Sequence, residues 1–196
     1  MQLLRKRQFW LFIAFAELIA FIIVSWGLIV TRQEVARYEG YYDTMLGNQV
    51  MVLFTAAHDN VRLLERLIAG ETLSFEEMTK LRDGTLTFSK SYSDLNGLVI
   101  QRLGKPSEKL SMEPAEIAYA MTQFFDKRVL LPDSDSFQIE GMEKQIQFMH
   151  GIHQQWIDAF GGGKSVPDPH QWKEIAEGLS IGTKDKSLEL ETILFR

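Results

Sequence analysis

The chain of 196 residues carries 21 basic and 26 acidic side chains, a net charge of −5 and no cysteine. Nucleic-acid-binding domains present basic patches, so this charge balance argues against a nucleic-acid partner. Without cysteine no disulfide can form, and core packing must stabilise the fold.

The most apolar part of the chain is Phe9–Val30, which has a single charged side chain, Glu17. At about 1.5 Å per residue, a helix of this length covers about 33 Å, enough to cross a hydrocarbon core of about 30 Å. Cleaved signal peptides have a shorter apolar core and a small-x-small cleavage site, and this segment has neither. The sequence therefore predicts an uncleaved membrane anchor, and no later segment resembles a second span.

The charges on either side of this anchor differ. The run Arg5–Arg7 precedes it, whereas Arg32 and Arg37 follow it interleaved with Glu34 and Glu39. Positive charge next to a span tends to stay in the cytoplasm. We therefore expect a cell-membrane protein with a single span, a cytoplasmic N-terminus and an extracytoplasmic C-terminal domain. Without the three leading basic residues and Glu17, the net charge of −5 becomes −7, so the outer domain is acidic.

Glu17 lies within the predicted span. A carboxylate near the centre of a membrane helix costs about 2.5–3.5 kcal/mol. Glu17, Ala20, Val24 and Gly27 share one helix face, and small residues allow a second helix to approach closely. This face predicts pairing with another transmembrane protein or self-association through the span. The alternative is a protonated carboxyl beside a water defect, tolerated because the rest of the span is hydrophobic.

Residues 38–68 show the first helical stripe beyond the span. Apolar residues recur at a spacing of three and four, with the polar Gln49 and Asn60 in the same stripe. Gly70 is placed to end this helix. No proline separates the stripe from the span, so one helix running through both is possible, with Gly40 and Gly47 as the easiest positions for a break.

The second predicted helix begins with a capping box. Ser74 is placed to accept a hydrogen bond from the Glu77 amide, while the Glu77 side chain reaches back to Ser74. Leu73 and Met78 are placed as the accompanying hydrophobic staple. The apolar face that follows comprises Phe75, Met78, Leu81, Phe88, Tyr92, Leu95 and Val99.

Three further helices follow. One begins at Glu113–Pro114, since proline is tolerated in the first turn, and ends before Pro132. The next has a heptad-type seam and ends at Gly161–Gly163. A short helix starts with Asp168 as its cap, and the last ten residues fit either a strand or a helix. The seam comprises Ile139, Met142, Ile146, Met149, His153, Trp156 and Phe160.

These elements predict an all-α fold, with one N-terminal transmembrane helix followed by an antiparallel four- or five-helix bundle. The short C-terminal tail is of uncertain structure. The predicted parts are a short cytoplasmic segment at 1–8, the anchor at 9–30, a linker or helix continuation at 31–37, an extracytoplasmic bundle at 38–180 and the tail at 181–196.

Histidines are the residues to consider for a metal. His150 and His153 lie three apart on one helix face, and His58 lies on the first helix of the bundle. Metal sites in helical bundles combine Glu with Glu-x-x-His pairs. The residue three positions before His150 is Gln147 instead of a glutamate, so the pattern favours hydrogen-bonded histidines over a metal site. We predict no metal and no cofactor. His153 is a candidate for pH sensing if it titrates near its ordinary pKa of about 6.5.

Other patterns that carry chemistry are incomplete. Gly161–Ser165 ends like a phosphate loop, but the required glycine at position 158 is Asp158, which favours a helix terminator. No nucleophile elbow occurs, and we expect no enzymatic activity. The seam residues Met142, Met149, Trp156 and Phe160 fit a plain core better than a ligand cavity, and the sequence does not indicate whether a small molecule binds.

The organisation of the chain favours an accessory or interaction protein of a cell-envelope complex, anchored by one span and presenting a helical bundle outside. The inner segment of about eight residues is too short for a folded output domain. The alternative is a small-ligand or pH-responsive bundle that signals through a partner membrane protein.

Overall fold

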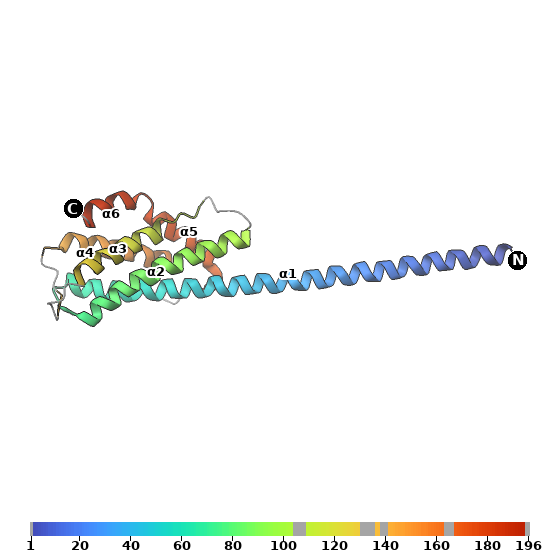
Figure 1. The fold of residues 1–196 in the computed structure, drawn as a ribbon, viewed down its shortest axis with the longest axis horizontal. Coiled ribbons are helices and arrows are strands. Elements are labelled where there is room, and N and C mark those ends of the chain that lie inside the picture. The colour runs from blue at the N-terminus through green and yellow to red at the C-terminus, as the bar shows by residue number, and fades with distance from the viewer. Residues whose placement is uncertain (1, 104–108, 130–135, 138–140, 163–166, 195–196) are drawn as a thin grey trace. The chain divides into compact units, whose positions relative to one another are not determined.

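The computed structural model describes residues 2–103, 109–129, 136–137, 141–162 and 167–194, and nearly all of them are helical (Figure 1). The all-α prediction is confirmed. The elements are α1 (Gln2–Ile68), β1 (Leu73–Ser74), α2 (Phe75–Leu103), α3 (Glu113–Val129), β2 (Ser136–Phe137), α4 (Glu143–Ala159), a 3₁₀ turn η1 (Pro169–Gln171), α5 (Trp172–Thr183) and α6 (Lys186–Leu194).

The chain divides into two compact units, Met1–Tyr41 and Tyr42–Arg196. The first unit is the N-terminal part of α1 and contains a stretch long and apolar enough to cross a membrane. From Phe15 onward its large apolar side chains are exposed, from Phe21 at 70% to Val30 at 38%. The helix α1 runs through Gly40 and Gly47 without a break.

The second unit is the helical bundle. Within it α2 packs along α3, α4 along α5 and α6 against α3. The C-terminal part of α1 and α2 run in opposite directions, because the connection between them is short (Figure 1). The predicted apolar faces supply most of the buried core, which includes Leu53, Phe88, Met121, Trp156 and Leu179.

The connection from α1 to α2 has the predicted local structure. Gly70 adopts a φ of 82°, where glycine is favoured, and its N–H donates to Leu67 O at 3.0 Å. The Ser74 N–H donates to Glu77 Oε2 at 2.9 Å and the Glu77 N–H to Ser74 Oγ at 3.2 Å. The capping box is therefore confirmed. Arg66 also binds Glu77, which lowers the pKa of that carboxyl to about 2.

Some predictions need correction. Phe75 is 52% exposed, because it is the first residue of α2, and Leu73 of β1 enters the core instead.

Asp168 accepts a hydrogen bond from the His170 N–H and so caps η1, and α5 starts only at Trp172. The tail forms the helix α6, whose residues Leu190 and Leu194 are buried in the core. Ile139 lies outside the described residues.

A polar clamp that the sequence did not predict joins α1, α2 and α5. Asp43 accepts hydrogen bonds from Arg102 and from the Trp172 indole N–H, the latter at 3.2 Å. The Arg102 guanidinium lies 5.2 Å from the centre of the Trp172 ring, a cation–π arrangement. The hydrogen bond from Arg102 is the main reason that the pKa of Asp43 is lowered.

Candidate functional site

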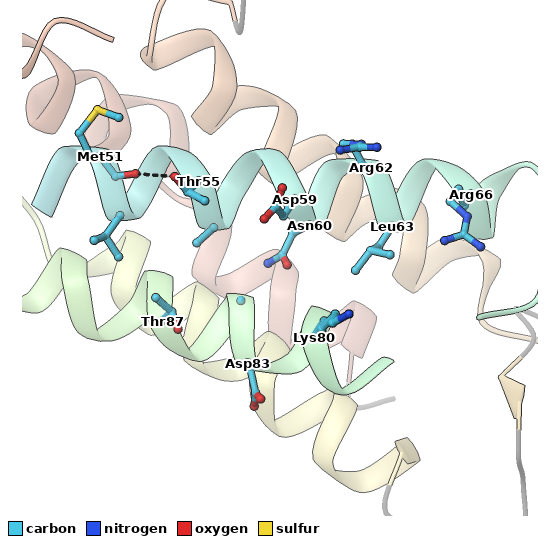
Figure 2. Close-up of a pocket in the computed structure, with 13 residues that line it drawn as sticks. Met51, Thr55, Asp59, Asn60, Arg62, Leu63, Arg66, Lys80, Asp83 and Thr87 are labelled. Atoms are coloured by element: carbon cyan, nitrogen blue, oxygen red, sulfur yellow. Dashed lines mark hydrogen bonds between the residues drawn. The ribbon is translucent and has the colours of Figure 1, made fainter. Parts of the chain in front are cut away.

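The bundle has an open groove between α1 and α2, with a volume of about 650 Å³ (Figure 2). The residues that line this groove are different from the seam residues that were candidates for lining a cavity. The exposed surface of its walls is mainly apolar, although most of the residues that line it are polar or charged. The apolar side chains are Met51, Val52, Ala56 and Leu63, all from α1.

Asn60 of α1 is the polar residue in the floor of this groove. Its side chain is buried, with 1% of the residue exposed. Gly84 of α2 faces it so closely that a Cβ atom at position 84 would lie 2.2 Å from Asn60 Oδ1. The missing side chain of Gly84 therefore provides the space that the Asn60 amide occupies.

His153 of α4 holds the other end of this amide. Asn60 Nδ2 lies 3.1 Å from His153 Nε2, and His153 Nδ1 lies 2.9 Å from Met149 O. Because a carbonyl oxygen only accepts, Nδ1 carries the proton and Nε2 accepts from the Asn60 amide. The neutral imidazole thus directs Nδ2 inward and leaves Oδ1 toward Gly84 and the groove.

Burial lowers the pKa of His153 to about 4. Desolvation disfavours the charged imidazole, and the hydrogen bond to Met149 offsets only part of this effect. The expectation that His153 titrates near 6.5 is therefore wrong, since that value applies to a solvated ring. His153 stays neutral around pH 6–8 and serves to position Asn60.

Aromatic rings pack behind this polar pair. The His153 ring meets Trp156 edge to face, with ring centres 4.8 Å apart, and Trp156 stacks on Phe88 at 3.8 Å. Met149 and Phe160 are also buried. These seam residues form plain core, as the sequence favoured, and the groove opens on the far side of Asn60.

The basic side chains of the groove lie toward the end where α1 finishes and α2 begins, as Figure 2 shows for Arg62, Arg66 and Lys80, whereas Asp59 and Asp83 lie nearer its middle. Arg66 and Lys80 each pair with glutamates in or just before the first turn of α2. Arg62 is exposed and has no ion-pair partner within the described ranges. This guanidinium is thus available to an anionic group of a ligand.

The three candidate histidines for a metal have separate environments. His58 lies 3.8 Å from Asp59, His150 lies 3.8 Å from Glu65, and His153 binds Asn60. In the part of the chain that the structure describes, no group of three or more His, Asp or Glu side chains is placed to hold a metal ion.

The glycine run after α4 ends that helix. Gly161 and Gly162 have φ values of 94° and 78°, and the Gly162 N–H donates to Ile157 O at 3.1 Å. This agrees with a helix terminator. Gly163, Lys164 and Ser165 lie outside the described residues.

The predicted membrane face remains open in the first unit. Glu17, Ala20, Val24 and Gly27 are all exposed, and nothing lies within 4 Å of the position that a Cβ would take at Gly27. Thr31 Oγ1 donates to Gly27 O at 2.9 Å, a bond within the same helix. The face therefore has room for a second helix.

Sequence reasoning missed the groove, although two signals pointed to it. Asn60 is one of two polar residues, with Gln49, in a mainly apolar stripe, and Gly84 lies in the interior of a helix, where glycine is unfavourable. Their meaning depends on the contact between two helices. Comparisons with protein-family models, with curated proteins and with solved structures found no match to this chain.

Proposed function

We propose that this chain is a single-pass, membrane-anchored interaction protein of a cell-envelope complex, which presents its helical bundle outside the cytoplasm. The observation that carries the proposal is the exposed apolar stretch of α1, whose most apolar window has none of its surface buried. The core helix of a soluble domain would be mostly covered by its own fold. An uncovered stretch of this length requires lipid or another protein around it.

The orientation rests on the charges beside the span. The basic run Arg5–Arg7 favours a cytoplasmic N-terminus, because positive charge is retained on that side. The bundle then lies outside, where an acidic domain without cysteine depends on core packing. The extended cluster of buried apolar residues in the second unit supports such a domain.

The absence of cysteine makes this orientation directly testable. Gln155→Cys on an exposed position of α4 should react with a membrane-impermeant maleimide in intact spheroplasts. Gln8→Cys, just before the span, should react only after the membrane is opened. The reverse pattern of labelling would overturn the orientation.

The partner contact is proposed for the face of Glu17, Ala20, Val24 and Gly27. An interhelical hydrogen bond in a membrane contributes about 0.6–2 kcal/mol, so Glu17→Leu should weaken association roughly 3- to 30-fold. A photo-crosslinking residue at Val24 should capture the partner, whether another transmembrane protein or a second copy. Ile22 lies opposite on the helix wheel and supplies the matched control. Equal capture at both positions, with unchanged co-purification of Glu17→Leu, would leave the span as a plain anchor.

A further inference from the structure

We infer that the groove between α1 and α2 docks an amphipathic helix of a partner protein, one that places an acidic residue opposite Arg62 and a hydrogen-bond donor above Asn60. This inference rests on the proposed function and assigns it a second contact surface, within the bundle.

The shape of the groove favours a helix. Its lining runs along α1 from Met51 to Arg66, which at about 1.5 Å per residue is roughly 22 Å, or about four helical turns. Small molecules usually bind where they are 70–90% enclosed. An open apolar groove between two helices instead resembles the sites that receive the apolar face of a third helix.

Asn60 supplies a polar contact in the floor of this groove. Only 1% of the residue is exposed, and its Nδ2 donates a hydrogen bond to His153. Within the described part of the chain Asn60 Oδ1 accepts no hydrogen bond, and it faces Gly84 at the groove. This oxygen is not one of the fully enclosed polar atoms that lack a partner, so it can accept a hydrogen bond from a donor that enters the groove. A hydroxyl or amide of a docked helix would supply the missing donor.

Charge gives the docked helix its direction. Arg62, Arg66 and Lys80 place basic groups in the lining of the groove, which also includes Asp59 and Asp83, and Asp83 pairs with Arg82. Of these three, Arg62 has no internal ion pair among the residues described. Complementary charge mainly sets partner choice and association rate. The acidic end of the partner helix therefore lies over Arg62.

The experiment places a photo-crosslinking residue at Val52 or at Thr87, on opposite walls of the groove, in the full chain in its native membrane. Gln155 and Lys173, exposed on α4 and α5, supply the control positions. Both groove positions should capture the same protein, at residues spaced three or four apart in a segment that carries an acidic side chain. The control positions should not capture that segment.

Arg62→Glu tests the charge contact. This exposed substitution should reduce the yield of the groove adduct about tenfold, Arg62→Lys should retain most of it, and Lys144→Glu on α4 should leave it unchanged. Far-UV circular dichroism of each variant checks the fold.

The remaining outcomes separate the two proposals. Partner capture at Val24 of the span without any groove adduct would overturn the docked helix and leave the proposed function standing. Groove adducts to lipid, to a small molecule or to a second copy of this chain would overturn a partner helix as the occupant. An absence of protein adducts at both the span and the groove would overturn both proposals.

Discussion

At residue 84 a side chain would collide with Asn60, since a Cβ atom there would lie 2.2 Å from Oδ1. Gly84→Ala should therefore destabilise the bundle by about 1–3 kcal/mol, as overpacking does. Gly97 lies in the same helix with nothing within 4 Å of its Cβ position. Gly97→Ala should stabilise by up to about 1 kcal/mol, because alanine is the better helix former.

Chemical unfolding of both glycine variants in mild detergent, followed by circular dichroism, measures this difference. If the two substitutions shift the unfolding free energy equally, the close contact between Asn60 and Gly84 does not exist in solution.

The buried imidazole of His153 makes stability depend on pH. In the unfolded chain it takes up a proton near pH 6.5, whereas in the folded bundle its pKa is about 4. Protons therefore favour the unfolded chain, and this contribution to stability is lost progressively as the pH falls from 6.5 to 4. At pH 5 the loss should be on the order of 2 kcal/mol relative to pH 8.

Unfolding measured from pH 8 to pH 4.5 tests this dependence. His153→Gln removes the titrating ring and should flatten the curve in that window, even though it lowers stability at pH 8. The pKa of Glu77 is lowered to about 2. The stability that this carboxylate contributes is therefore lost mostly below pH 4.5, its ordinary pKa. An unchanged slope in His153→Gln would mean that His153 is not the group responsible.

At the scale of single elements, the capping box at the start of α2 can be tested in the same way. Ser74→Ala removes the oxygen that accepts the Glu77 N–H and should cost about 1 kcal/mol. Ser93→Ala makes the same chemical change in the interior of α2, where alanine is preferred, and should be neutral or slightly stabilising. A similar loss in both variants would show that the cap contributes nothing specific.

The helices themselves were largely predictable. Apolar spacing identified the buried faces, while Gly70 and Ser74 marked where one helix ends and the next begins. Helix-end hydrogen bonds are local, so neighbouring sequence specifies them. The tail was ambiguous because Leu188–Glu191 also alternates like a strand. Its helical structure depends on the packing of Leu190 and Leu194 into the core.

For the whole molecule, the division at Tyr41 and Tyr42 predicts that residues 42–196 fold without the span. Among the residues whose side chains the structure describes, the buried core begins at Leu46, so the fragment retains the apolar contacts of that core. It should be soluble without detergent and unfold in one helical transition close to that of the full chain. Insolubility or a loss of helical signal would show that the bundle depends on the N-terminal part of α1.

The sequence by itself determined the class of the molecule: one apolar helix able to cross a membrane, joined to amphipathic helices that must bury their faces against one another. Periodicity and capping are properties of neighbouring residues, so they can be read along the chain. Only the tertiary structure decided what Asn60 does, because its partners Gly84 and His153 come from two other helices. The same packing excludes water from His153 and moves its pKa from 6.5 to about 4, a shift that no spacing of residues along the chain could predict.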